Sequence, residues 1–219
     1  SIGTLRKGLR EMGVAQNTLV WFMSDNGGLP RLDPPSTGGL RSFKGSMYEG
    51  GLRVPAIIEW PKGISKVRIT KHPAGAVDIF PTIAEVAGLE KSDLLKPQDG
   101  MSLAKLFLKE LGPRQKPLPF RSRGRIAVVD NDYKMISFPD SGKTRYELYN
   151  LAKDMSEQDN LVKKEPKIAN RLRKRLKAID ASVTASVNGQ DYPEKKVAPQ
   201  PPRIFWWESE SYRPYFSEW

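Results

Sequence analysis

Two oxygen-bearing side chains, Asp25 and Asn26, follow directly after a short apolar run at residues 19–23. Carboxylate and amide oxygens are the ligands that hard cations such as Ca²⁺ or Mg²⁺ prefer. The next two residues, Gly27 and Gly28, would allow the backbone to fold closely around an ion. Because such a cation takes about six or more oxygen ligands, we expect its other ligands to come from elsewhere.

The Asn26-Gly27 dipeptide is also a strong β-hairpin signal, since both residues tolerate a positive φ angle. A hairpin needs a second strand directly after its turn, whereas residues 29–39 contain three prolines and no apolar alternation. On the residues alone, both a metal site and a tight turn stay open as interpretations.

A single lysine, Lys44, lies in a loop flanked by glycines, and this loop could bring its ammonium group against a ligand. An ammonium group is a compact positive charge that suits one oxygen of a tetrahedral anion. The alternative is an ordinary solvated surface lysine. The loop ends with Glu49 and Arg53, for which we expect structural pairing or capping. The flanking glycines are Gly38, Gly39, Gly45, Gly50 and Gly51.

A helix and a strand are predicted before Asp25. Apolar residues recur at spacings of three and four over residues 2–12, and Gly13 is the expected end of that helix. The run at 19–24 is short and rich in β-formers, which favours a buried strand. Ligands of open α/β sheets collect beyond the carboxyl ends of strands, so this strand would place Asp25 where binding sites form.

Further elements follow the glycine-rich loop. The pattern predicts a second strand at 54–60 and a helix that has Asp78 as its N-cap and ends at Gly88. Ser102 is the expected cap of another helix, which would end at Gly112. Helices that alternate with short apolar strands indicate an α/β fold.

The character of the sequence changes at Pro113, where prolines interleave with basic residues as in a linker. Short strand-like runs separated by turn sequences then predict an antiparallel meander at 125–129, 133–138 and 144–150. An amphipathic helix that starts at Pro166 is expected to pack on this sheet.

We therefore predict three parts. They are an α/β core in residues 1–112, a small antiparallel sheet with one helix in 113–187, and a tail rich in proline and aromatic residues in 188–219.

The net charge of +11 makes the surface attractive to polyanions, whether nucleic acid, an anionic membrane or an acidic substrate. The lack of cysteine excludes disulfides, thiolate metal sites and cysteine nucleophiles in this chain. No apolar run approaches the roughly 20 residues that span a bilayer, so no transmembrane segment is expected. The chain opens at Ser1 in a helical pattern, and we expect the true N-terminus to lie elsewhere.

Five segments, in this order, resemble the C-terminal half of a type I sulfatase, a formylglycine-dependent, arylsulfatase-like family. The similarity covers residues 1–161 and rests on TLVWFMSDNGG, LRSFKGSMYEGGLRVP, VDIFPTIAEVAGL, DGMSLAKLF and YELYNLAKDMSEQDNL. The resemblance implies an α/β fold, the C-terminal part of an alkaline-phosphatase-like sulfatase core, followed by a small α+β subdomain. It implies a sulfuric ester hydrolase acting on a sulfated carbohydrate or aryl substrate, in a periplasmic or secreted protein.

The resemblance also implies roles for three residues. In such enzymes an Asp-Asn pair after a core strand holds one Ca²⁺ together with two aspartates from the N-terminal half, so Asp25 and Asn26 are the expected metal ligands. The lysine of the KGxxxEGG element contacts the sulfate, which makes Lys44 the expected catalytic and substrate-binding residue. A formylglycine-generating or anaerobic sulfatase-maturating enzyme would be the partner that makes the nucleophile.

The sequence departs from the family at the nucleophile. Formylglycine arises in a Cys/Ser-x-Pro-x-Arg motif, but the chain lacks cysteine, and Ser137-Phe138-Pro139 is followed by Asp140 and Ser141. We therefore expect a truncated chain, inactive alone, with the nucleophile and the remaining ligands upstream. Met155 stands where the family usually has proline, which affects only a turn.

Two alternatives are a phosphate-ester hydrolase of the same superfamily and a non-catalytic basic module that binds polyanions. Two-zinc phosphatases need His and Asp ligands, and the sole histidine is His72, which we expect on a surface loop. The binding module predicts strong salt dependence, whereas the sulfatase interpretation expects no nucleic acid partner. A basic helix face that could serve the module carries Lys163, Lys164, Lys167, Arg171, Arg173, Lys174, Arg175 and Lys177.

Overall fold

A computed structural model describes residues 1–94, 96–191, 194 and 210 of the chain. The chain divides into two compact units, Ser1–Ser182 and Val183–Trp219. All elements discussed below lie in the first unit, apart from the end of the last helix. Most of the predicted tail at 188–219 lies outside the described residues. Among the described helices, none combines the length and the hydrophobicity of a membrane-spanning segment.

The first helix, α1, spans Ile2–Glu11 and confirms the predicted amphipathic helix. Gly13 follows it with a φ angle of 72°, a left-handed conformation that glycine adopts without strain and that ends helices. The helix buries none of its residues, and Leu5 is 51% exposed. Its apolar stripe is therefore open in the described part of the chain.

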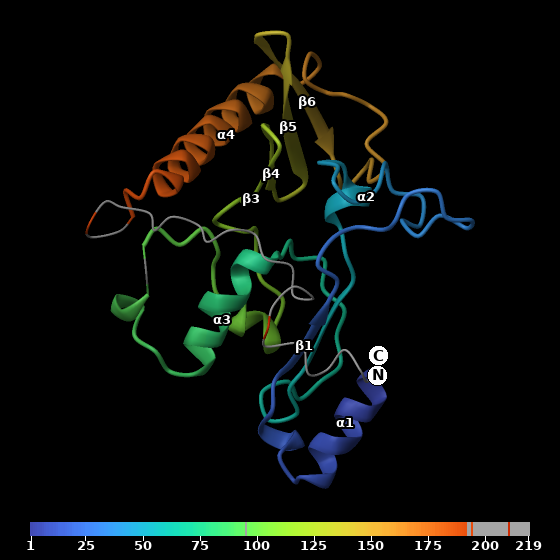
Figure 1. Cartoon of the computed structure of the whole chain (residues 1–219), viewed down its shortest axis with the longest axis vertical. Coiled ribbons are helices and arrows are strands. Elements are labelled where there is room, and N and C mark those ends of the chain that lie inside the picture. Colours follow the sequence, from blue (N-terminus) through green and yellow to red (C-terminus); the bar gives the residue numbers. More distant parts are fainter. Residues whose placement is uncertain (95, 192–193, 195–209, 211–219) are drawn as a thin grey trace. The chain divides into compact units, whose positions relative to one another are not determined.

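Two short strands lead into and out of the glycine-rich loop (Figure 1). They are β1, Val20–Met23, and β2, Ala56–Glu59, and they pair antiparallel as a sheet of their own. The prediction that the first strand is buried is wrong, because Phe22 is 45% exposed and its partner Ile57 is 64% exposed. A ribbon of two strands lacks the neighbouring strands and layers that bury the strands of a larger sheet.

Helix α3 spans Ile79–Val86 and stops before Gly88, as predicted. Asp78 occupies the N-cap position, but its carboxylate makes no hydrogen bond to the first turn. It instead accepts hydrogen bonds from the backbone N–H groups of Gly75 and Met101 and from the guanidinium group of Arg114. The described residues also form four short 3₁₀ helices, at Ala15–Asn17, Ala76–Asp78, Lys91–Asp93 and Ala104–Phe107.

The prediction of a helix after Ser102 is wrong, since only the 3₁₀ turn Ala104–Phe107 forms there. The Ser102 hydroxyl does accept a hydrogen bond from the N–H group of Ala104. The N–H group of Leu103, however, donates to the buried hydroxyl of Thr82 in α3. Leu103, Leu106 and Phe107 are all buried, so tertiary contacts override the local helix propensity.

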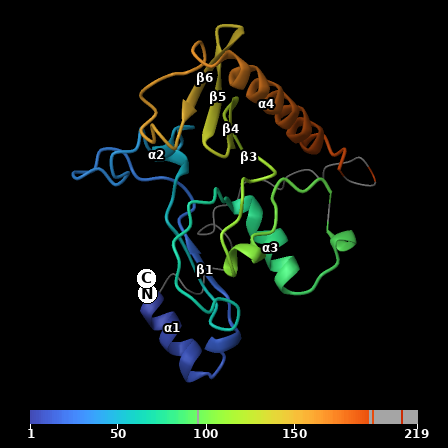
Figure 2. The same ribbon diagram turned by 180° about the vertical axis from the view of Figure 1, so that it is seen from behind.

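The predicted meander is confirmed as a four-stranded antiparallel sheet in the order β3-β4-β5-β6 (Figure 2). Its strands are β3 Leu118–Ser122, β4 Arg125–Asp130, β5 Tyr133–Asp140 and β6 Lys143–Asn150. The linker prediction after Pro113 is wrong in part, because β3 lies in that stretch. Pro119 is tolerated in β3 because this strand is at the edge of the sheet.

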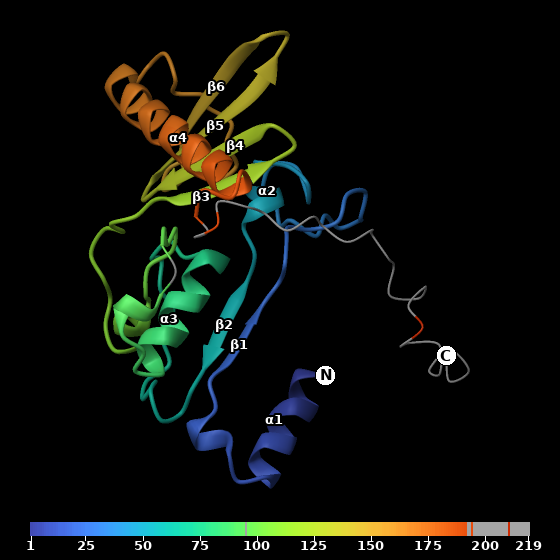
Figure 3. The same ribbon diagram turned by 60° about the vertical axis from the view of Figure 1, so that its left-hand side comes forward.

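Helix α4 spans Pro166–Val187, as predicted from Pro166 onward, and lies across one face of the sheet (Figure 3). Leu172 and Leu176 of this helix pack with Val128, Met135 and Leu148 of the strands. The other face of the sheet packs against Met47 through residues that include Ala127, Ile136 and Tyr149. The sheet therefore holds α4 on one face and the glycine-rich loop on the other.

Candidate functional site

The turn that carries Asp25 and Asn26 is fastened to the loop that carries Lys44 by two backbone hydrogen bonds. The Gly27 N–H group donates to the carbonyl of Gly51 at 3.0 Å, and the Lys44 N–H group donates to the carbonyl of Gly28 at 2.9 Å. These bonds bring the three predicted site residues to one place.

Three glycines permit this close approach. A Cβ atom on Gly27 would lie 2.0 Å from the carbonyl oxygen of Gly50, and one on Gly50 would lie 2.2 Å from that of Ser42. A Cβ atom on Gly51 would lie 2.3 Å from the carbonyl oxygen of Ser46. Such distances are far inside van der Waals contact, so only glycine lets these backbone segments meet.

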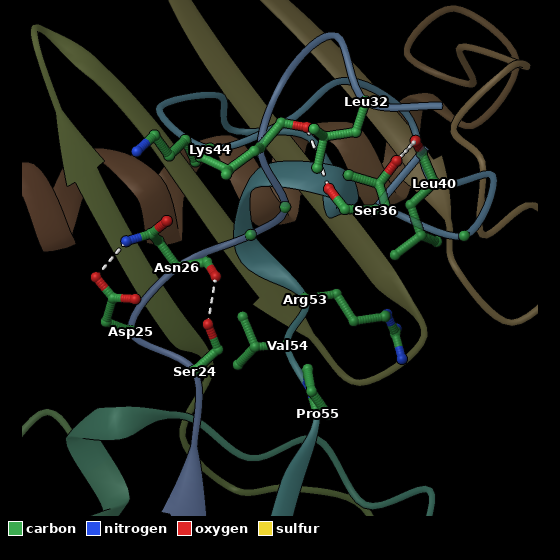
Figure 4. A pocket seen from close by; sticks show the side chains of 15 residues that line it. Ser24, Asp25, Asn26, Leu32, Ser36, Leu40, Lys44, Arg53, Val54 and Pro55 are labelled. Atoms are coloured by element: carbon green, nitrogen blue, oxygen red, sulfur yellow. Dashed lines mark hydrogen bonds between the residues drawn. The ribbon is translucent and has the colours of Figure 1, made fainter. Parts of the chain in front are cut away.

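The result is an open pocket of about 850 Å³ at the carboxyl end of β1 (Figure 4). Asp25, Asn26 and Lys44 all line it. Figure 4 shows the side chains of Lys44 and Asn26 extending to the same side of the view, whereas Arg53 extends to the opposite side. The other lining residues are Ser24, Gly27, Gly28, Leu29, Leu32, Ser36, Thr37, Gly38, Leu40, Val54 and Pro55.

The exposed side chains of Asp25 and Asn26 contact each other, because the Asn26 amide donates a hydrogen bond to the Asp25 carboxylate. The Ser24 hydroxyl donates to the Asn26 carbonyl at 2.9 Å, which closes the turn around them. Adjacent carboxylate and amide oxygens fit a hard cation such as Ca²⁺. Within the described residues no group of three or more His, Cys, Asp or Glu residues surrounds them, so the fit is to part of a coordination shell.

Lys44 is exposed, and its ammonium group makes no hydrogen bond or ion pair with any other described residue. Arg53, the other cation of the pocket lining, differs in this respect because it is bound to Glu49 at 2.6 Å. Arg41 donates to the hydroxyl of Tyr149 and to the carbonyl of Glu157. Lys44 is therefore the pocket cation that is available to an anionic ligand.

Behind the pocket the loop is fixed by buried charges. Glu49, for which pairing was expected, binds Arg53 and also Lys134 of β5, whose ammonium group is 2.9 Å away. Burial disfavours the charged form of Glu49, but Lys134 and then Arg53 outweigh it, so the pKa of Glu49 is below its ordinary value. Glu49 thus stays ionised between two cations.

A second anchor joins the loop to β6 through two tyrosines. Tyr48 and Tyr149 both donate hydrogen bonds to the Glu147 carboxylate, at 2.7 and 2.8 Å. Burial and then the Glu147 carboxylate raise the pKa of Tyr48 to about 12 and also raise the pKa of Tyr149. The Arg41 guanidinium group stacks 3.8 Å above the centre of the Tyr48 ring, which adds a cation–π contact.

Sequence reasoning missed Lys134 and Glu157, although the strand pattern contained a signal for the first. Lys134 shares a strand face with Ile136 and Phe138, two positions apart each, and that face packs into the core with Met47. A charged residue on the apolar side of a strand needs a buried partner. No comparable local signal marks Glu157.

The remaining candidates lie outside the pocket lining. His72 is partly buried instead of on the surface, and its Nε2 atom has no hydrogen-bond partner among the described residues. Burial first, and then the nearby Arg114, lower the pKa of His72. On the basic helix face Arg171 and Arg175 pair with Asp130, whereas Lys167, Lys174 and Lys177 are exposed. Lys163 and Lys164 do not belong to this face, because α4 begins at Pro166.

Comparison with known proteins finds sulfatases among the similar sequences. The model of the Sulfatase family matches residues 1–89. The chain is 34% identical over 169 residues to a sulfatase of Formosa agariphila, covering 70% of this chain and 30% of the relative. It is 34% identical over 191 residues to arylsulfatase A of Homo sapiens, covering 74% of this chain and 37% of the relative.

A solved structure shares the architecture. The crystal structure of Ps i-CgsB in complex with k-i-k-neocarrahexaose superposes with a TM-score of 0.68 and 28% sequence identity, over 81% of this chain and 39% of that one. This chain therefore has the α/β architecture of the alkaline-phosphatase-like sulfatase fold, as expected from its motifs. It spans about a third of the length of the curated relatives that it matches. The chain belongs to the sulfatase family.

Proposed function

We propose that this chain is part of a sulfuric ester hydrolase that removes sulfate from a sulfated carbohydrate or aryl substrate. The observation that carries this proposal is the pair of backbone hydrogen bonds that put Lys44 in one pocket with Asp25 and Asn26. Hard oxygen ligands beside an unpaired ammonium group suit a sulfate ester, which carries its negative charge on a tetrahedral group.

Lys44 is the catalytic and substrate-binding residue in this proposal. Its ammonium group is exposed in the pocket and has no described partner, so it is free to contact a non-bridging oxygen of the sulfate. A fixed positive charge at this place stabilises the charge that builds on the transferring sulfuryl group.

Asp25 and Asn26 would hold one Ca²⁺ ion, with its other ligands outside this chain. When bound, the ion would neutralise negative charge and orient the nucleophile. The two side chains already contact each other in the pocket wall. Their acidic and amide oxygens would be drawn to a cation with little rearrangement of the turn.

The nucleophile would be a formylglycine located outside residues 1–219, made by a maturating enzyme that acts on the whole protein. Ser137, the one serine of this chain in a Ser-x-Pro sequence near the family pattern, is unsuited to that role. It is buried in β5, and its hydroxyl donates to the carbonyl of Ile126 in the neighbouring strand.

A sulfated glycan is the favoured substrate class. Ps i-CgsB, whose fold this chain shares, was solved with a bound neocarrahexaose. The net charge of +11 on this chain would attract a polyanionic glycan. The exposed Leu29 and Leu32 at the pocket add apolar surface on which a sugar or aryl ring could lie.

The proposal is tested by assaying the whole protein with a generic aryl sulfate and the matching aryl phosphate, before and after treatment with a chelator. We expect faster turnover of the sulfate ester, loss of turnover with the chelator and recovery on addition of Ca²⁺. Faster turnover of the phosphate ester would favour the phosphatase alternative. Binding of a sulfated polymer without turnover, steeply weakened by salt, would instead favour the polyanion-binding module.

A further inference from the structure

A buried ionic cluster, formed by Glu49, Lys134 and Glu157, lies behind the pocket. Lys134 comes from β5, Glu49 from the four-residue helix α2 at Glu49–Leu52, and Glu157 from the segment that follows β6. The Lys134 and Glu157 side chains are fully buried, and the Glu49 side chain is 5% exposed. We call these three residues the Lys134 cluster.

Lys134 is the cation between two carboxylates. Its Nζ atom lies 2.9 Å from Glu49 Oε1 and 2.9 Å from Glu157 Oε1. The contact with Glu49 is a hydrogen bond. The contact with Glu157 is an ion pair whose geometry does not meet the angular requirement of a hydrogen bond. Because burial raises the pKa of Glu157 above its ordinary value despite Lys134, the charge of this carboxylate depends on the cation beside it.

The cluster fixes both ends of the segment that carries Lys44. At the start of the segment, the Arg41 guanidinium group donates to the carbonyl of Glu157 at 2.7 Å. At its end, the backbone N–H group of Glu49 donates to Glu157 Oε2 at 2.6 Å. Lys44 therefore lies in a loop whose two ends are held by one residue, and that residue is held by Lys134.

The cluster also reaches the pocket wall through neighbouring residues. Glu49 directly precedes Gly50 and Gly51, the glycines that meet the Gly27 backbone. Its carboxylate also binds Arg53, which lines the pocket. Lys134 itself does not line the pocket, so any effect of this residue on the site must pass through Glu49 and Glu157.

We propose that Lys134 is a positioning residue of the site. Through Glu49 and Glu157 it holds residues 41–53 against the turn of Asp25, and it thereby sets the place of the Lys44 ammonium group in the pocket. This inference rests on the proposed function of that pocket. A buried ionic group of this kind is not required as a whole for stability, since apolar residues of similar volume often replace such groups without loss of stability. Removal of one member alone is different, because it leaves a buried charge without its partner. What an apolar residue cannot replace is the attachment of the loop to the sheet.

The test replaces Lys134 with methionine in the whole protein and measures kcat and KM for an aryl sulfate, together with amide hydrogen exchange at Lys44 and Gly27. We expect kcat to fall roughly 10- to 100-fold, as for displaced catalytic groups, and exchange at these two amides to become faster. The double variant Lys134→Met, Glu157→Gln removes the unpaired charge while keeping Glu49 paired with Arg53. We expect it to fold as stably as the wild type but to keep the low kcat.

Lys143→Met is the matched control, because Lys143 is an exposed lysine of the adjacent strand β6. We expect wild-type kcat and exchange in this variant, and partial recovery of kcat in Lys134→Arg. A wild-type kcat and unchanged exchange in the double variant would overturn the proposal. If the wild-type protein turns over no sulfate ester, the proposed function fails, and exchange at the Lys44 amide still decides whether Lys134 holds the loop.

Discussion

The backbone N–H group of Lys44 donates a hydrogen bond to the carbonyl of Gly28 at 2.9 Å. This bond joins the loop of the candidate anion-binding lysine to the turn of the candidate metal ligands. The site is therefore assembled by main-chain contacts, and the Lys44 ammonium group is left free to meet a ligand. Preorganisation of this kind is what electrostatic catalysis requires.

The glycine contact is directly testable with Gly27→Ala. A Cβ atom at this position would meet the carbonyl oxygen of Gly50 at 2.0 Å, so the two backbone segments must separate. We expect a loss of roughly 1–3 kcal/mol in the free energy of unfolding and a lower rate of aryl sulfate hydrolysis. The control is Gly8→Ala in α1, where nothing lies within 4 Å of the added atom. It should stabilise the helix by about 0.5–1 kcal/mol, and equal effects of the two substitutions would contradict the steric argument.

The buried pair of Asp78 and Arg114 should dominate the stability of the region around α3. Both side chains are 0% exposed, and their closest atoms are 2.7 Å apart. Arg114→Met leaves the buried Asp78 carboxylate with only its two backbone donors. We therefore expect the free energy of unfolding, measured with denaturant, to fall by about 3–5 kcal/mol. The surface pair of Lys164 and Asp159 offers a comparison, since Lys164→Met should cost less than about 1 kcal/mol. Similar costs for both variants would show that burial does not set the strength of the first pair.

The raised pKa of Tyr48 predicts that the free energy of unfolding decreases at alkaline pH. Its pKa is about 12 in the folded protein, against an ordinary value of 10.0, because of burial and the Glu147 carboxylate. A raised pKa means that the stabilisation is fully present below pH 10.0 and is lost as the pH rises toward about 12. The difference in unfolding free energy between the wild type and Tyr48→Phe should therefore shrink over this interval. A difference that stays constant with pH would refute the assignment.

The metal assignment predicts that Asp25→Ala removes bound calcium. Loss of the carboxylate takes away the charged ligand of the pair and leaves the neutral Asn26 amide as the one ligand from this turn, which weakens the site. Metal content of the purified whole protein should fall from one Ca²⁺ ion to a small fraction of that. Asp33→Ala is the control, because Asp33 is an exposed aspartate of the same loop that does not line the pocket. Full calcium content in Asp25→Ala would exclude Asp25 as a ligand.

Local patterns were sufficient for much of the fold. Periodicity and capping residues located α1, α3, α4 and the meander, because each depends on nearby residues. Two predictions failed where distant contacts decide the outcome. The sequence after Ser102 is a good helix former, yet the bond from Leu103 to Thr82 spans 21 positions and favours a single turn. β1 has the composition of a buried strand, but it pairs only with β2 among the described strands and stays partly exposed.

The residues of the site also fall into two groups, those that a local sequence pattern marks and those that only distant contacts bring together. Asp25, Asn26 and Lys44 could be selected from residue type, glycine spacing and family resemblance, and the structure brings them to one pocket. Lys134 and Glu157 could not, because Lys134 meets Glu49 across 85 positions of sequence. The residues that would perform the chemistry carry a local pattern, whereas those that hold them in place are paired only by the fold.

The role of Lys44 is tested by the Lys44→Ala variant of the whole protein, assayed with an aryl sulfate at saturating concentration. We expect a fall in kcat of roughly 10²- to 10³-fold, the usual effect of removing one group that stabilises developing charge. Lys66→Ala, which removes an exposed lysine outside the pocket, should retain the wild-type rate. A wild-type kcat in Lys44→Ala would show that Lys44 does not act on the sulfate and would remove it from the site.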